Sequence, residues 1–201
     1  MSPSSPLPMK RRIYLADLTH TAQGISAATF PLGISFVVSY AKKELGAGYD
    51  FRLFKFPATL DVALRTEPPA MLCLSNYSWN MELAYTMERL AKEAAPELIV
   101  VFGGPNFPIE AVEQKDYLGR RPALDFHIQF EGELGFVDLV RKLETHAFSA
   151  AKLKRSRERV LNTVYLSDDR IVSGPTERIS DINVIPSPYL TGILDEHFSL
   201  P

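Results

Sequence analysis

Three short polar stretches contain the residue types that bind ligands. They are Ser75-Asn76-Tyr77-Ser78-Trp79-Asn80, Gly103-Gly104-Pro105-Asn106 and Glu131-Gly132-Glu133, and each follows an apolar or alternating run and precedes a predicted helix. In a parallel α/β sheet, such segments meet at the carboxyl ends of the strands, where ligands bind. The sequence therefore predicts a ligand-binding edge built from three loops.

The first two of these loops offer neutral contacts rather than ionic ones. Gly103 and Gly104 allow a large flat or branched ligand to approach the main chain, and Pro105 stiffens the turn. Hydroxyl, amide and aromatic groups of the first loop add hydrogen bonds and ring surface. This combination suits a bulky, mostly uncharged organic cofactor, although the glycine pair is also compatible with a tight turn that binds nothing.

Other kinds of chemistry lack their motifs. The sequence contains no Gly-x4-Gly-Lys-Ser/Thr and no Gly-x-Ser-x-Gly, and its four histidines are not at metal-ligand spacing. Glu131 and Glu133 have the chemistry of an acid/base pair, but before a helix they equally well stabilise its N-terminal dipole. We predict no catalytic residue and no metal ligand.

Composition narrows the class of protein. The 201 residues, 46% hydrophobic and 23% charged with a net charge of −2, can form one substantial core and offer no general attraction to nucleic acid or acidic membranes. The single cysteine, Cys73, lies in an apolar run, so an internal disulfide or an Fe–S cluster is excluded. With no run of membrane-spanning length, we expect a cytoplasmic protein without nucleic-acid or membrane partners.

The hydrophobic pattern alternates strands with helices. Strands are expected at 13–16, 51–56, 70–74, 98–102 and 126–130, with helices at 31–45, 59–65, 79–94 and 134–143. The first, third and fourth strands are apolar throughout, whereas the second and fifth are half polar and suit the sheet edges. The pattern predicts an α/β fold: a flavodoxin-like or Rossmann-like doubly wound, five-stranded parallel sheet of order 2-1-3-4-5.

The chain is expected to have three parts. Residues 1–10 are predicted to be a disordered leader, residues 11–147 the ligand-binding α/β domain, and residues 148–201 a charged linker, a C-terminal β-hairpin extension and a junction to a missing domain. The basic run within 152–159 is interpreted as a solvated connector, with an anion-binding patch as the alternative.

At these motifs the chain resembles the N-terminal cobalamin (B12)-binding domain of the B12-dependent radical S-adenosylmethionine (SAM) enzymes. The resemblance covers roughly residues 11–192, and its order and spacing are more specific than any one piece. The matching pieces are Pro31-Leu32-Gly33, Leu74 to Asn80, Val101 to Asn106, Glu131-Gly132-Glu133 and Ile185-Pro186-Ser187-Pro188-Tyr189-Leu190.

The resemblance implies that the corrin ring lies over the carboxyl edge of the sheet, with its nucleotide tail beside the Gly-Gly turn. The loop 17–29 would lie near the lower face of the cobalt. The implied cofactor-binding residues are Thr21, Gln23, Pro31, Leu32, Gly33, Ser75, Tyr77, Trp79, Asn80, Gly103, Gly104, Pro105, Asn106, Glu131, Gly132 and Glu133.

Two departures from the family pattern shape the expected function. The loop Asp17-Leu18-Thr19-His20 stretches the Asp-x-His-x2-Gly motif, so we favour base-off binding over cobalt ligation by His20. The Cys-x3-Cys-x2-Cys motif is missing, so SAM and the [4Fe-4S] cluster would belong to a radical SAM barrel elsewhere in the parent chain.

The expected function is therefore that of the cobalamin-binding domain of a truncated B12-dependent radical SAM methyltransferase, with cobalamin as the only cofactor bound by this chain. Two alternatives stay open at this point. One is a freestanding corrinoid-binding sensor or carrier, and the other is a cofactor-free flavodoxin-like interaction domain.

Overall fold

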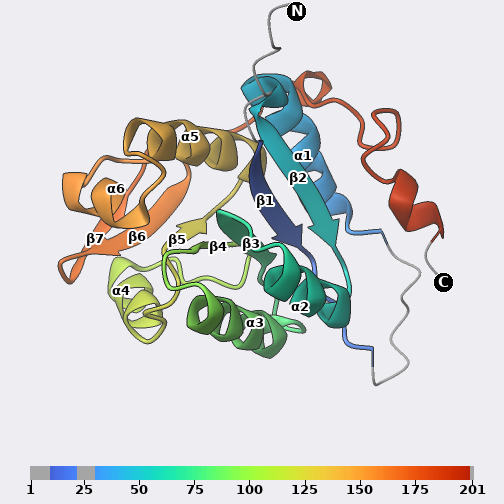
Figure 1. The fold of residues 1–201 in the computed structure, drawn as a ribbon. Helices are drawn as coiled ribbons and strands as arrows, with labels where there is room; N and C mark the ends of the chain where they lie inside the picture. The colour runs from blue at the N-terminus through green and yellow to red at the C-terminus, as the bar shows by residue number, and fades with distance from the viewer. Residues whose placement is uncertain (1–9, 22–29, 200–201) are drawn as a thin grey trace, which may run out of the picture.

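The computed structural model describes residues 10–21 and 30–199. In these ranges the chain forms an α/β fold around one mixed sheet of seven strands, in the order β2-β1-β3-β4-β5-β6-β7 (Figure 1). Strands β1 to β5 are mutually parallel, whereas β6 and β7 are antiparallel. The strands are β1 (Arg11–Ala16), β2 (Tyr49–Phe54), β3 (Met71–Ser75), β4 (Ile99–Gly103), β5 (Phe126–Ile128), β6 (Thr163–Ser167) and β7 (Arg170–Ser173).

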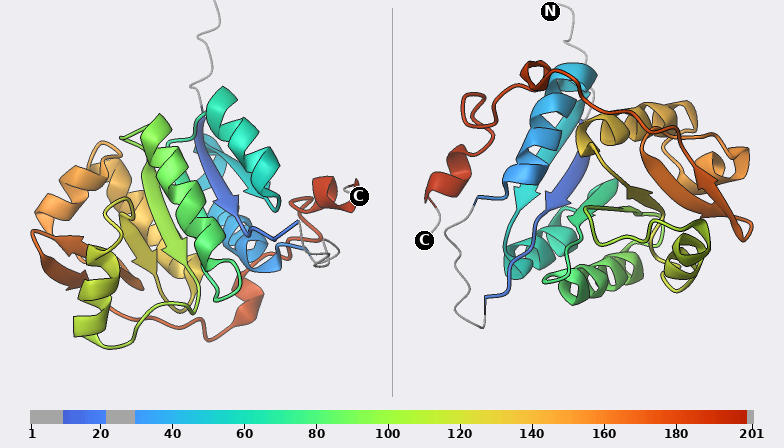
Figure 2. Two further views of the ribbon diagram at one scale, coloured as in Figure 1. Left: turned by 90° about the horizontal axis from the view of Figure 1, so that it is seen from below. Right: turned by 180° about the vertical axis from the view of Figure 1, so that it is seen from behind.

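Helices cover both faces of the sheet (Figure 2). One face packs against α1 (Leu32–Leu45) and α5 (Gly132–Thr145), with α6 (Ala150–Ser156) beside α5. The opposite face packs against α2 (Pro57–Thr66), α3 (Met81–Ala94) and α4 (Ala111–Gly119). Short 3-10 helices span Gly46–Gly48, Ile182–Val184 and Asp195–Ser199. This two-sided cover explains why the buried stretches of the central strands are largely apolar.

The two hydrophobic cores are separated by the alternation of side chains along the strands. Leu15, Cys73 and Val101 point to the α1/α5 face, whereas Leu72 and Val100 point to the α2/α3/α4 face. Successive side chains of a strand lie on opposite faces, so each central strand contributes to both cores.

The expected five-stranded sheet is incomplete, and β5 is not an edge strand. The C-terminal hairpin continues the same sheet because β6 pairs antiparallel with β5, with His127 opposite Val164 and Ile128 opposite Thr163. His127 is therefore fully buried. Its polarity, which suggested an edge, is accommodated by stacking on Phe107, with ring centroids 3.9 Å apart.

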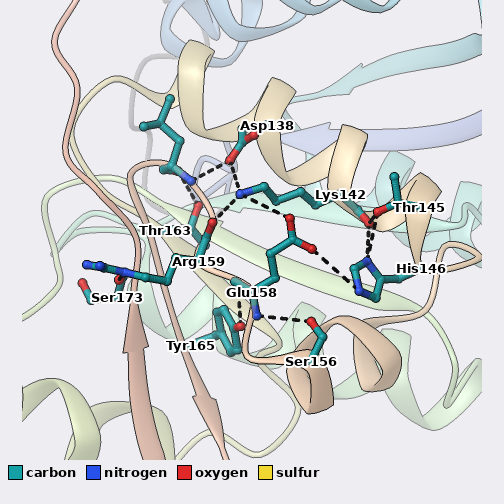
Figure 3. Close-up of polar contacts among 11 residues, drawn as sticks. Asp138, Lys142, Thr145, His146, Ser156, Glu158, Arg159, Thr163, Tyr165 and Ser173 are labelled. Carbon is teal, nitrogen blue, oxygen red and sulfur yellow. Dashed lines mark hydrogen bonds and ion pairs between the residues drawn. The ribbon is translucent and has the colours of Figure 1, made fainter.

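Part of the basic segment interpreted as a solvated connector folds as α6, which packs beside α5, while most of its basic side chains are exposed. Leu153 of this helix is fully buried in the α1/α5 core. Beyond the helix, Glu158 lies 3.7 Å from Lys142 Nζ, which also contacts Asp138 at 3.2 Å (Figure 3). The backbone N–H of Leu161 donates to Asp138 at 2.7 Å. The hairpin is thus fixed to the main domain by polar contacts as well as by sheet pairing.

The segment after β7 returns to α1 along the side of the domain that α5 and α1 cover (Figure 2). Ser39 Oγ donates to the carbonyl of Pro186 at 2.5 Å, and Lys43 Nζ donates to the carbonyl of Val184 at 2.7 Å. Leu194 is fully buried. The C-terminal segment therefore packs onto the same domain in the described part of the chain.

Glu88 in α3 is a buried carboxyl group that makes stability depend on pH. Burial raises its pKa from the usual 4.5 to about 7, with Arg121 opposing the shift and Asp125 adding to it. Between those two pH values the folded state holds more protons than the unfolded state, so stability falls as pH rises, by about 3 kcal/mol in total. We expect Glu88→Gln to be about 2–3 kcal/mol more stable than the wild type at pH 8 and indistinguishable from it at pH 4.5, by urea unfolding. An equal difference at both pH values would contradict this origin of the pH dependence.

Candidate functional site

A cavity of about 230 Å³ opens at the carboxyl ends of β1, β3, β4 and β5. Its walls are the first turns of α1 and α5, which lie on the same face of the sheet. From these helices it is lined by Gly33, Ile34, Val37, Gly132, Glu133 and Phe136. From the strands and the residues that follow them it is lined by Leu15, Asp17, Cys73, Ser75, Val101 and Gly103.

The strand side of the cavity consists of two layers. In the outer layer, Ser75 pairs in register with Gly103, and Gly103 with Ile128. One pleat deeper, Leu15 pairs with Cys73, and Cys73 with Val101. Residues two apart on a strand share a face and lie about 6.6 Å apart along it, so the deeper row forms an apolar floor below the outer row.

Glycines keep this cavity open. Gly33, Gly103 and Gly132 all line it, and none of them projects a side chain into the space. A Cβ atom added to Gly103 would have the carbonyl oxygen of Ile128 as its nearest neighbour, at 3.8 Å, and one on Gly33 would lie 4.0 Å from the hydroxyl of Tyr77. The space above the floor therefore exists because these positions lack side chains.

Asn76 fixes the Gly-Gly turn to the end of β3. This fully buried residue donates its backbone N–H to the carbonyl of Gly103 at 2.7 Å and accepts the side-chain amide of Asn106, also at 2.7 Å. Its own amide donates to the hydroxyl of Tyr117 at 3.1 Å. Gly104 has φ +120°, and a Cβ there would lie 2.7 Å from the carbonyl oxygen of Asn76, so only glycine fits this position.

Polar groups gather at the mouth of the cavity. Ser75 Oγ donates to Asp17 Oδ1, which ties the end of β3 to the end of β1. Burial raises the pKa of Tyr77, with a smaller contribution from the Asp17 carboxylate, and burial likewise raises the pKa of Glu133. The hydroxyl of Tyr77 therefore remains protonated at neutral pH and can donate a hydrogen bond to a ligand at the mouth.

Seven of the sixteen residues that the sequence suggested line the cavity: Gly33, Ser75, Tyr77, Gly103, Gly104, Gly132 and Glu133. The structure places the others elsewhere. Pro31 and Asn80 are buried, and the side chain of Asn80 bonds to the backbone N–H of Tyr77 and the carbonyl of Leu18. Glu131 pairs with Arg178 of the C-terminal segment.

The remaining predicted residues do not line the cavity, or they lie outside the described part of the chain. Trp79 stacks on Tyr77 with ring centroids 4.4 Å apart and is 65% exposed. Pro105 and Thr21 are exposed, and Gln23 lies outside the described residues. Leu32 and Asn106 are partly buried without lining the cavity.

Sequence reasoning missed most of the apolar lining. The missed residues are Leu15, Ile34, Val37, Cys73, Leu74, Val101, Phe102, Ile128, Phe130 and Phe136. Side chains on one face of a strand recur every second residue. The floor residues Leu15, Cys73 and Val101 could therefore have been identified two positions before Asp17, Ser75 and Gly103.

The described residues near the cavity do not form a set of ligands for a directly bound metal ion. Nε2 of His20 lies 2.9 Å from the carbonyl oxygen of Trp79 and outside the cavity lining. Burial raises the pKa of the Cys73 thiol far above neutrality and lowers the pKa of His127 to about 3, so both are neutral at pH 7. Among the described residues, no group of three or more His, Cys, Asp or Glu side chains is placed to hold a metal.

None of the helices in the described ranges has both the length and the apolar composition needed to cross a membrane. No protein-family model matches the chain. Curated relatives and solved structures do match it.

The chain is 32% identical over 179 residues to 2-(S-pantetheinyl)-carbapenam-3-carboxylate methyltransferase of Streptantibioticus cattleyicolor, which covers 86% of this chain and 25% of that enzyme. It is 29% identical over 175 residues to the cobalamin-dependent radical SAM methyltransferase TokK of Streptomyces tokunonensis, which covers 82% of this chain and 24% of TokK. The chain thus spans about a quarter of the length of these relatives.

The fold has a counterpart among solved structures. The cobalamin-dependent SAM radical enzyme OxsB, with aqua-cobalamin and SAM bound, superposes with a TM-score of 0.68 at 17% identity, over 93% of this chain and 25% of OxsB. At this identity the likeness concerns the fold alone. Together with the curated relatives, it confirms the resemblance seen in the sequence: the chain is homologous, over about a quarter of their length, to the cobalamin-dependent radical SAM methyltransferases.

Proposed function

We propose that this chain is the cobalamin-binding part of a longer B12-dependent radical SAM methyltransferase, with a Rossmann-like, flavodoxin-like arrangement of its parallel strands. The observation that carries the proposal is the glycine-lined cavity at the carboxyl ends of the strands, in a chain homologous to cobalamin-dependent enzymes. In open α/β sheets this edge is the usual place for a ligand.

The dimensions of the cavity suit one portion of the cofactor. At about 230 Å³ it is smaller than the roughly 300–1,000 Å³ of pockets that enclose a whole drug-sized ligand. It therefore accommodates the flat nucleotide base of cobalamin, whereas the corrin ring would remain over the loops at the mouth. The apolar floor matches an aromatic base, so the residues present fit the group.

Each wall of the site has a separate task in this proposal. The floor of Leu15, Cys73 and Val101 would exclude water from the base. Gly103 and Gly104, which lack side chains, would let the nucleotide tail approach the main chain. Tyr77 and Ser75 would donate hydrogen bonds near the mouth. When bound, cobalamin supplies a cobalt centre able to carry a methyl group. With the base held in the cavity, it would not coordinate the cobalt, and His20, which lies against the carbonyl of Trp79 outside the cavity lining, would not take its place.

The remaining parts of the reaction are proposed to lie outside this chain. SAM and a [4Fe-4S] cluster need a cluster motif of three cysteines, and the sequence has one cysteine in total. We assign both to the radical SAM barrel of the parent protein, where the substrate would also bind.

Retention of cobalamin by the purified chain tests the proposal. The 201-residue chain is mixed with hydroxocobalamin, desalted and measured by visible absorption, with bovine serum albumin treated in parallel. We expect an equimolar corrinoid spectrum to stay with the chain and to be unchanged in His20→Ala. A folded chain that emerges colourless would overturn the proposal, and a spectrum altered by His20→Ala would overturn base-off binding without histidine.

A further inference from the structure

The floor of the cavity differs chemically from its mouth. The floor row of Leu15, Cys73 and Val101 contains no side-chain nitrogen or oxygen, and Phe136 and Val37 close it from the helices. Its one heteroatom is the Cys73 sulfur, and burial keeps this thiol protonated by raising its pKa. A thiol is a weak hydrogen-bond donor and a weak acceptor, so the floor has almost no capacity for hydrogen bonds.

The polar side chains of the cavity all belong to its outer part. Asp17 and Ser75 lie in the outer strand layer and are engaged with each other, and Tyr77 and Glu133 come from a loop and from the first turn of α5. The backbone amides of the floor row are in the central strands of the sheet and are used in its ladders. A group that reaches the floor therefore meets only apolar surface.

We propose that this floor selects among corrinoids by their nucleotide base, accepting an apolar benzimidazole and rejecting a purine. The inference rests on the proposed function, since it concerns the base that the cavity would enclose. An adenine brings an exocyclic amine and additional ring nitrogens to the floor, and these lose their bonds to water without replacement. The methyl groups of dimethylbenzimidazole instead gain apolar contact there.

Binding of three corrinoids to the full chain tests this selectivity. The probes are cobalamin, an otherwise identical cobamide with adenine as the base, and cobinamide, which lacks the nucleotide. We expect the adenine cobamide to bind at least about tenfold more weakly than cobalamin. Burying one polar group without a hydrogen-bond partner weakens binding by about this factor. Equal affinities for the two complete cobamides would overturn the selectivity and leave the proposed function standing. Binding of none of the three would instead overturn the proposed function.

A pair of matched variants separates the floor from general stability. Val101→Thr places a hydroxyl group in the floor at nearly constant volume, whereas Val100→Thr makes the same change one residue earlier, on the opposite and equally buried face of β4. We expect Val101→Thr to narrow the gap between cobalamin and the adenine cobamide by roughly threefold or more, since the hydroxyl can pair with the purine. Val100→Thr should keep the wild-type gap. The same gap in both variants would overturn the role of the floor.

Discussion

Valine in place of Gly103 is expected to abolish most cobalamin binding while leaving the fold intact. The position faces the cavity, and an added Cβ would meet its nearest atom at 3.8 Å, which is ordinary contact. The valine side chain would occupy the space of the base, and forcing both groups into it costs about 1–3 kcal/mol, which weakens binding roughly 10- to 100-fold. Isothermal titration with hydroxocobalamin measures the loss.

The stability of this variant should move in the opposite direction. Glycine weakens a strand, and a β-branched residue favours one. The free energy of unfolding of Gly103→Val, measured with urea, is therefore expected to be about 0.5–1 kcal/mol higher than that of the wild type. Gly48→Val is a suitable control, because a Cβ at Gly48 meets nothing within 4 Å and the residue is remote from the cavity lining. If Gly103→Val bound cobalamin as the wild type does, the base could not lie in this cavity.

Alanine in place of Gly104 is expected to damage both the fold and the site. Its Cβ would lie 2.7 Å from the carbonyl oxygen of Asn76, and its φ of +120° is rarely adopted by residues with side chains. Strain of this kind together with the close contact should lower the free energy of unfolding by roughly 2–5 kcal/mol. Urea unfolding of the chain without ligand gives this difference directly.

The control for Gly104→Ala is the same change at the end of α4. Gly119 has space around its Cβ position and is the last residue of a helix, so Gly119→Ala should be neutral or slightly stabilising. Cobalamin binding should be lost in Gly104→Ala and retained in Gly119→Ala. Wild-type stability of Gly104→Ala would show that the turn is not fixed against Asn76 as described.

The positions of the parallel strands could be predicted from the sequence, because buried strands consist mainly of apolar residues. The runs around Leu72 and Val100 are apolar on both faces, as interior strands require. The hairpin could be recognised but not placed, since alternation in β6 says nothing about which strand it pairs with. Its pairing partner β5 contains the buried His127, whose polarity pointed instead to an edge.

The sequence did not predict two of the helices, because each of them buries only one apolar residue. In α6 only Leu153 is buried, within a basic run, and in α4 only Gln114 and Leu118 are buried. The apolar stripe of such a helix is too short to be recognised from the spacing of hydrophobic residues in the sequence.

The site was predictable at its edge and not at its floor. Glycines and polar residues at the ends of strands, such as Gly103 and Ser75, indicate a ligand-binding edge because these residue types are unusual in a buried core. Leu15, Cys73 and Val101 look like ordinary core, and only the register of the strands shows that they lie beneath an opening. Glu131 does not line the cavity and pairs with Arg178, a partner 47 positions later that no local pattern reveals.

Asn76 gives capture of the cofactor a particular thermodynamic character. By bonding to both Gly103 and Asn106, it ties together two of the loops around the opening. A preorganised receptor loses little conformational entropy on association, so less of the contact energy is offset by ordering of the site. Complex formation should then follow simple one-step kinetics, with a residence time governed by how fast the buried base escapes.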